Sequence, residues 1–187
     1  MKRLLVTAAA LSVLMAPAFA DPAKWTVDPA RSHLGFSVQW SGQAFNATFK
    51  SWKAVVAFDP VDLAHSKAVV TIDLNSEDSG SEDNDEGLKG AEGFATDKFP
   101  AAKFETTGFA AKGNNAYVAT GQLSLHGVTK TITLPFTLTI SGNRAHMTGK
   151  VAVSRIDFGL GEGEWAGDTP IAHAVTITVD LTATRAH

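Results

Sequence analysis

One segment constrains the fold of this chain more than any other, the alternating stretch 121–140 with the sequence GQLSLHGVTKTITLPFTLTI. From Ile132 to Ile140 every second residue is apolar, and the residues between them are three threonines and one proline. Successive side chains of a β-strand point to opposite faces, so this period of two predicts a strand with one apolar and one polar face. His126-Gly127 separates it from a similar segment that ends at Leu125, which predicts an antiparallel hairpin.

The same period of two recurs along the chain and predicts about eight main strands. Residues 25–28 are predicted to form a first short strand or a lid segment, which ends at Pro29. The parity of the apolar positions changes between Phe49 and Trp52, which predicts a bulge or corner near residues 50–51. The apolar rows fall in the segments 34–40, 45–49, 52–58, 68–74, 117–125, 132–140, 145–153 and 175–181.

Many short antiparallel strands joined by polar turns are typical of a β-sandwich or a β-barrel. A sandwich fills its interior with its own side chains, whereas a closed barrel of about eight strands is just wide enough to hold one small ligand. The apolar rows combine large residues with small ones, as in Tyr117, Ala119 and Gly121, and small residues leave room on an apolar face. We therefore predict an all-β fold, an eight-stranded antiparallel barrel with an apolar cavity.

An acidic segment interrupts the alternation at residues 77–86, where six of the ten residues are acidic. We predict a loop here that leads into a short helix at about 85–94, with Leu88, Ala91 and Phe94 on a small apolar face. A bound divalent cation is an alternative, but the glycine placement does not fit an EF-hand loop and no glutamate stands at the twelfth position. A solvated loop is the preferred interpretation, and no metal site is predicted.

The first 20 residues have the features of a secretory signal peptide. Two basic residues precede an apolar run at 4–15, and Ala18-Phe19-Ala20 forms a cleavage site. The apolar run is too short to span a bilayer. We predict cleavage after Ala20, which leaves one exported domain, residues 21–187.

The composition of that predicted domain excludes several classes of function. It holds 14 basic and 19 acidic residues, a formal charge of −5, which disfavours binding to nucleic acid. It has no second long apolar stretch, so no stable membrane insertion is expected. The chain contains no cysteine, so its stability must come from a sizeable core or a closed sheet rather than from disulfides.

Few residues have a spacing that indicates chemistry. None of the six histidines forms a helical metal pair, and His126 lies near Ser124 without a G-x-S-x-G motif around that serine. The segment 155–157, Arg-Ile-Asp, is predicted to form a buried ion pair at a barrel end or, as the alternative, to contact the polar head of a ligand. We predict no catalytic residue and no cofactor.

Several motifs taken together resemble the YceI-like family of periplasmic lipid-binding proteins. They span nearly the whole predicted domain, and the turn L-H-G-V-T-K and the helical segment that ends in F-P are the most distinctive. The carrying segments are DPARSHLGFSV at 28–38, VAFDP at 56–60, NDEGLKGAEGFATDKFP at 84–100, Lys103-Phe104, GQLSLHGVTKTITL at 121–134 and RIDFG at 155–159.

The resemblance implies a lipocalin-like barrel that carries polyisoprenoid chains or related long amphiphiles, some members being linked to quinone metabolism or stress responses. Arg31, Trp40 and Asn84 depart from the usual family pattern of polar residues, which leaves the head group open. The alternation adds Ile72 to the cavity lining. The residues that the resemblance assigns to the lining or lid are Phe36, Val38, Phe58, Leu88, Phe94, Phe99, Phe104, Leu123, Leu125 and Phe158.

We therefore expect a carrier that binds a long isoprenoid, an isoprenoid quinone or another lipid, and not an enzyme. One alternative is an enzyme that acts on such a lipid inside the barrel through Asp157, His126 or His173. Another is an interaction module whose acidic residues Glu82, Asp83, Asp85 and Glu86 dock a basic partner. A homodimer, through a sheet edge or through the loop that contains Trp165, is left open.

Overall fold

The structure, a computed structural model, describes residues 21–186 apart from the side chain of Glu164. The predicted signal peptide, residues 1–20, lies outside this range and stays a prediction. One α-helix, α1 (Glu82–Lys89), accompanies the strands in the described range, with short 3-10 helices at Pro29–Arg31, Leu74–Ser76, Arg155–Phe158 and Gly163–Trp165. The strands are β1 (Lys24–Val27), β2 (His33–Trp40), β3 (Gln43–Phe49), β4 (Trp52–Ala57), β5 (Lys67–Asp73), β6 (Glu77–Asp78), β7 (Ala101–Gly113), β8 (Ala116–Leu125), β9 (Val128–Ser141), β10 (Arg144–Ser154) and β11 (Ile171–Arg185).

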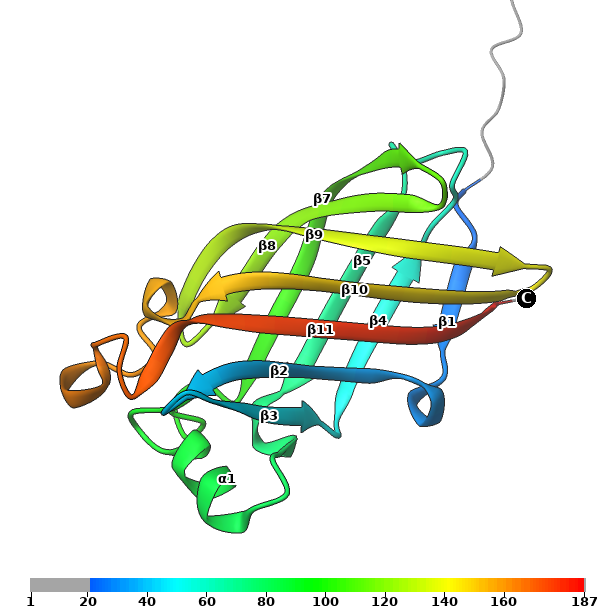
Figure 1. Cartoon of the computed structure of the whole chain (residues 1–187). Helices are drawn as coiled ribbons and strands as arrows, with labels where there is room; N and C mark the ends of the chain where they lie inside the picture. Colours follow the sequence, from blue (N-terminus) through cyan, green and yellow to red (C-terminus); the bar gives the residue numbers. More distant parts are fainter. Residues whose placement is uncertain (1–20, 187) are drawn as a thin grey trace, which may run out of the picture.

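Antiparallel strands close into a barrel. The ring runs β1-β4-β5-β7-β8-β9-β10-β11, and pairing of β1 with β11 closes it, with Trp25 opposite Arg185. The strands β2, β3 and β6 extend β1, β4 and β5 past three breaks, and β2 pairs with the long β11 (Figure 1). The predicted eight-stranded antiparallel barrel with a short helical insertion is therefore confirmed.

Each of the three breaks turns the chain at a polar corner. Asp28 accepts a hydrogen bond from Ala30 N at 3.0 Å and begins the 3-10 turn that separates β1 from β2. The corner predicted at residues 50–51 is confirmed, because β3 ends at Phe49 and β4 begins at Trp52. Ser76, from the corner between β5 and β6, holds it in place: its hydroxyl accepts a hydrogen bond from Ser51 N at 2.9 Å.

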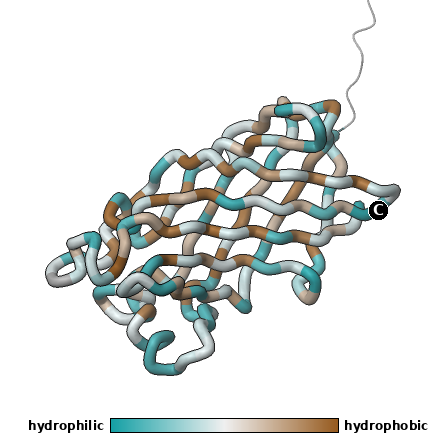
Figure 2. Tube along the Cα trace, viewed as in Figure 1, coloured by the Kyte–Doolittle hydropathy of each residue, from teal (hydrophilic) through white to brown (hydrophobic). Residues whose placement is uncertain are grey.

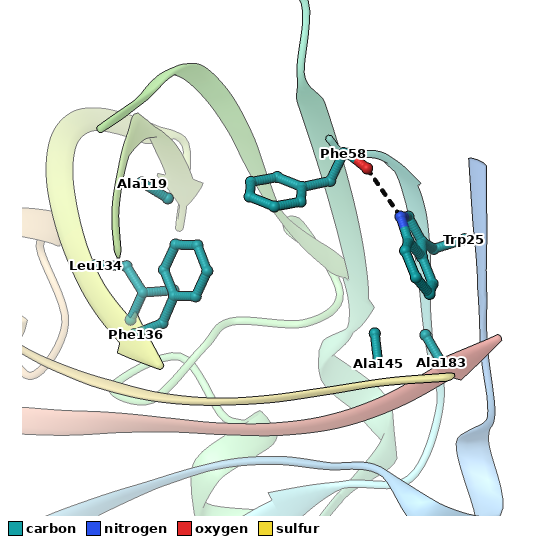
Figure 3. Close-up of a cluster of buried hydrophobic side chains, with 7 residues drawn as sticks. All are labelled: Trp25, Phe58, Ala119, Leu134, Phe136, Ala145 and Ala183. Carbon is teal, nitrogen blue, oxygen red and sulfur yellow. Dashed lines mark hydrogen bonds between the residues drawn. The ribbon is translucent and has the colours of Figure 1, made fainter. Parts of the chain in front are cut away.

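Alternation along the strands places the apolar residues inside. Figure 2 shows hydrophobic and hydrophilic residues alternating along the strands. The ring is filled at the end near β1 by a buried cluster of Trp25, Phe58, Ala119, Leu134, Phe136, Ala145 and Ala183 (Figure 3). The indole N–H of Trp25 donates to Phe58 O at 2.9 Å, and the Phe58 ring packs edge-on against Phe109 and Tyr117. Aromatic edge contacts of this kind make a dense floor for the barrel.

The helix begins and ends earlier than the sequence pattern predicts. It spans Glu82–Lys89 rather than about 85–94, so most of the acidic run lies in its first turns rather than in a loop. Carboxylates are favourable at a helix N-terminus, where the backbone N–H groups are unpaired. Gly90 ends the helix, and the chain then folds back so that Phe94 N donates to Leu88 O at 2.6 Å and the Phe94 ring is buried.

Small residues in the strands do not all leave free space, contrary to the simplest interpretation of the apolar rows. A Cβ added at Gly121 would lie 2.6 Å from Glu105 O and 2.6 Å from Cε2 of Phe104. The ring of Phe104 thus occupies the space that a side chain at position 121 would need. Gly108, across the same strand pair, has no heavy atom within 4 Å of its would-be Cβ.

We expect Gly121→Ala to destabilise the barrel by about 1–3 kcal/mol, because the added methyl collides with backbone and with a packed ring. Gly108→Ala, the matched control, should be neutral or slightly stabilising, because alanine restricts the unfolded chain without a clash. Urea denaturation followed by tryptophan fluorescence measures both. Equal midpoints for the two variants would contradict this account of the packing.

Candidate functional site

Two apolar cavities lie in series inside the barrel. The outer cavity has a volume of about 510 Å³ and lies beneath α1, between β2, β3 and the segment that follows β10. The inner cavity, about 170 Å³, lies deeper and reaches the aromatic floor at Trp25, Phe58 and Phe136. The lining of the inner cavity is almost entirely apolar, so water gains little by occupying it. The lining of the outer cavity is mainly apolar but includes four polar or charged residues, Asp83, Asn84, Glu92 and Arg155.

Four aliphatic side chains line both cavities and mark the boundary between them, which we call the constriction. They are Leu34 of β2, Ile72 of β5, Leu123 of β8 and Ile177 of β11. They come from different strands, so the constriction is a property of the closed ring and not of one local segment. An elongated ligand would have to pass it to reach the floor.

The structure brings most of the predicted lining residues together. The inner cavity is lined by Phe58, Ile72, Phe104 and Leu123. Phe99 lines neither cavity and packs edge-on against His126, with ring centroids 4.8 Å apart. That these residues contact a ligand stays a prediction. The outer cavity is lined by Phe36, Val38, Ile72, Leu88, Phe94, Leu123, Leu125 and Phe158.

Other lining residues were not singled out from the sequence. Leu34 and Ile177 belong to predicted apolar rows, so their period of two was a sufficient signal. Leu160 and Trp165 also line the outer cavity. They lie in a glycine-rich segment without periodicity, where no local pattern indicates which side chain turns inward.

Two segments cover the outer cavity. One contains α1 and the residues up to Phe99, and the other follows β10 from residue 155 to 170; both lie at the same end of the barrel (Figure 1). A hydrogen bond from Gly161 N to Glu92 O, 3.0 Å long, joins them. Their contact joins the two segments into one cover over part of the outer cavity.

Arg155 organises the second covering segment from within. Its side chain is buried and donates to six backbone carbonyl oxygens: those of Leu160, Gly161, Trp165, Gly167, Ile171 and Ala172. Burial lowers the pKa of the guanidinium, and the charge of Asp168 partly offsets that effect. The predicted ion pair with Asp157 is wrong, because Asp157 is exposed and the guanidinium bonds to carbonyls instead. The planar fork of arginine suits this set of acceptors better than a lysine ammonium would.

Glu77 is a buried carboxylate beneath the first covering segment. Its side chain is 0% exposed, and Lys89 Nζ of α1 lies 3.6 Å from Oε1, too far for a hydrogen bond. Neither carboxylate oxygen has a hydrogen-bond partner. Burial therefore raises the pKa of Glu77, although Lys89 opposes the rise. The neighbouring Asp78 behaves oppositely, because Lys50 Nζ bonds to it at 2.5 Å and lowers its pKa.

Three of the polar side chains that the sequence offers as candidate catalytic groups make hydrogen bonds to other partners and not to one another. The hydroxyl of Ser124 lies 2.7 Å from Thr129 Oγ1, and His126 Nδ1 donates to Phe158 O at 3.2 Å, so the two do not form a nucleophile–base pair. His173 Nε2 donates to Ala166 O at 2.9 Å. Within residues 21–186, no three or more histidine, aspartate or glutamate side chains gather in a way that could hold a metal ion.

In the part of the chain that the structure describes, no helix has the length and apolar character needed to cross a membrane.

The sequence matches a known protein family over most of its length. Residues 25–183 match the family model of the YceI-like domain. This chain belongs to the YceI-like family. Among its YceI-like relatives, a UPF0312 protein of Shewanella denitrificans is 32% identical over 169 residues, covering 86% of this chain and 88% of the relative. A UPF0312 protein of Photorhabdus laumondii is 35% identical over 130 residues, covering 69% and 67%.

Solved structures show the same YceI-like barrel. BcnA of Burkholderia cenocepacia is 31% identical, with a TM-score of 0.82 over 85% of this chain and 100% of that one. A polyisoprenoid binding domain from Saccharophagus degradans, implicated in plant cell wall breakdown, has a TM-score of 0.70 over 88% and 99%. At 18% identity the second likeness shows the fold alone.

We expect Glu77→Gln to change how the stability of this YceI-like domain depends on pH. A carboxyl with a raised native pKa binds more protons in the folded state, so its contribution falls as pH rises from the ordinary 4.5 through the raised value. The glutamine variant lacks this loss and should gain stability relative to the native chain between pH 4 and pH 7.

Thermal melts at pH 4, 5, 6 and 7 measure the effect. Asp78→Asn is the control of opposite sign, because Asp78 has a lowered pKa and its contribution is lost as pH falls. The ordinary pKa of Asp78 is 3.8 and its native pKa is lower, so the difference between wild type and the Asp78 variant should shrink only below about pH 4. Additional melts at pH 3 and 3.5 measure this control. A Glu77 variant whose deficit grows with pH would contradict the assignment.

Proposed function

We propose that this protein is a periplasmic carrier that binds one long apolar lipid, such as a polyisoprenoid chain or an isoprenoid quinone, inside the barrel. The observation that carries the proposal is the pair of linked apolar cavities, of about 510 and 170 Å³. Cavities of about 300–1,000 Å³ are typical of small-molecule sites. Membership of the YceI-like family, and the likeness in fold to a polyisoprenoid binding domain, support the same interpretation.

Burial of an apolar chain supplies the binding free energy. Each methylene group removed from water contributes about 0.8 kcal/mol, so a chain of about ten buried carbons is bound without any charged contact once ordering costs are subtracted. Such a site distinguishes ligands by length and girth. The predicted signal peptide supports a periplasmic location, where a free lipid of this kind would be almost insoluble.

A binding role agrees better with the polar groups of the lining than an enzymatic role does. General acid–base chemistry requires a side chain within hydrogen-bond reach of the reacting group and free to exchange a proton. Arg155, Thr106 and Trp25 line the cavities, but each already bonds to backbone atoms. The two carboxylates of the outer lining, Asp83 and Glu92, belong to residues that are exposed to solvent. Asp157, one of the residues named for the enzymatic alternative, is exposed.

Lipid extraction tests the proposal directly. Protein purified from the periplasm should release a long-chain isoprenoid or related amphiphile into organic solvent, identified by mass spectrometry. The emptied protein should then bind geranylgeraniol with a change in tryptophan fluorescence, since Trp40 and Trp165 line the outer cavity. Repeated extracts without lipid, together with no uptake of geranylgeraniol or an isoprenoid quinone, would overturn the proposal.

We expect Leu123→Phe to weaken binding of long chains selectively. The larger ring narrows the constriction and excludes about two methylene groups from the inner cavity, which corresponds to about tenfold in the dissociation constant. Geraniol, short enough for the outer cavity, should lose much less affinity than geranylgeraniol. Val55→Phe is the control, because Val55 is 73% exposed on β4. Equal losses for both alcohols would argue against a ligand that passes the constriction.

A further inference from the structure

The inner cavity dictates which end of an amphiphile enters first. No charged residue lines it, and two of its polar side chains already bond to the backbone. Thr106 Oγ1 accepts from Ala68 N at 2.8 Å, and the Trp25 indole donates to Phe58 O. A head group placed there would lose its hydration without replacement, at a large cost. On the proposed function, the tail therefore points inward and the head group lies in the outer cavity.

Among the described residues, the outer cavity has almost no free hydrogen-bond donor or positive charge with which to bind an anionic head group. Arg155 is the one cationic residue among those that line it in the described range. All five of its N–H groups are already engaged, because the guanidinium donates to six carbonyl oxygens. Its charge also faces that of Asp168. A phosphate could bond to Arg155 only by breaking the interactions that hold the covering segment.

The remaining charges near the outer cavity are mostly negative. Asp83 and Glu92 line it. The covering segment 77–99 has eight acidic and two basic residues, and the segment 155–170 has four acidic and one basic. Lys89, one of the two basic residues in the first segment, lies 3.6 Å from Glu77. The charges of the two segments would repel an anion that approaches the cavity.

The helix gives an anion no compensating site. A free helix N-terminus attracts anions through its unpaired N–H groups and its dipole. In α1 the first turn already has three carboxylates, Glu82, Asp83 and Asp85. Asn84, whose amide is uncharged, also lines the outer cavity and can bond to a hydroxyl or a carbonyl.

We propose that the site selects by head-group charge: it binds an isoprenoid chain that ends in an uncharged hydroxyl or carbonyl, and discriminates against the same chain ending in phosphate. The discrimination comes from the saturated Arg155 and the carboxylates of the cover. This inference rests on the proposed function, and it adds the chemical class of the head group.

Two ligands of equal chain length test it on the full-length mature protein. Geranylgeraniol and geranylgeranyl monophosphate are titrated at pH 7.5 in low salt, below their aggregation limits, with tryptophan fluorescence as the readout. The alcohol should bind at least about tenfold more tightly, and 0.5 M salt should narrow the gap because it screens the carboxylates. Phosphate binding as tight as alcohol binding overturns the inference while leaving the carrier proposal intact. Binding of neither ligand overturns the carrier proposal and the inference with it.

A charge-neutralised variant separates electrostatic selection from the different solubility of the two ligands. In Asp83→Asn with Glu92→Gln, the ratio of the phosphate to the alcohol dissociation constant should fall about threefold or more. The matched control, Glu105→Gln with Asp180→Asn, removes two charges away from both cavities and should leave that ratio unchanged. An unchanged ratio in the Asp83 and Glu92 variant, with its fold verified by circular dichroism, overturns the role assigned to the cover.

Discussion

The pairing of β1 with β11 is the contact on which the rest of the structure depends. Only a few residues of β1 take part, with Trp25 opposite Arg185 and Val27 opposite Ala183. They close the ring, so no strand of the eight is left with an open edge there. Closure also forces the apolar row of every strand toward one interior. A chain without disulfides thereby gains an apolar interior that its own side chains fill only in part.

The three corners explain why the interior has two compartments. Before the corners, β1, β4 and β5 form walls of the inner cavity, where Trp25, Phe58 and their neighbours fill the ring. Beyond them, β2, β3 and the turn at Leu74 form walls of the outer cavity. A corner lets one strand serve two surroundings with different parity, because the break resets which face points inward. The polar contacts of Ser76 that join two corners therefore help to define the apolar cavities.

Local periodicity was enough to predict most of the strands and the corner at residues 50–51, because a period of two is imposed by the strand itself. The ring strands β1 and β7 are absent from the predicted apolar rows. Periodicity was not enough where packing against an adjacent strand decides which side chain fills the interior. Gly121 reads as an empty place in the row, yet Phe104 from the adjacent strand fills it. The register shift between Thr106 and Gly108 brings Phe109 inward, and no pattern in that strand announces it. The helix began three residues before the predicted start, because its acidic residues suit a first turn.

The sequence left two roles open for Arg155, a buried ion pair or a contact with a ligand head group. The hydrogen bonds that Arg155 makes in the structure connect the order of the cover with the chemistry of the cavity. A buried cation without a bonded carboxylate costs free energy unless every N–H finds an acceptor. Here the acceptors are carbonyls of an irregular, glycine-rich segment that has few ladder bonds of its own. The side chain of Arg155 therefore orders this segment, and all its N–H groups are engaged in doing so. The charge that orders the cover is for this reason already engaged, and the cavity beneath it is lined mainly by apolar side chains.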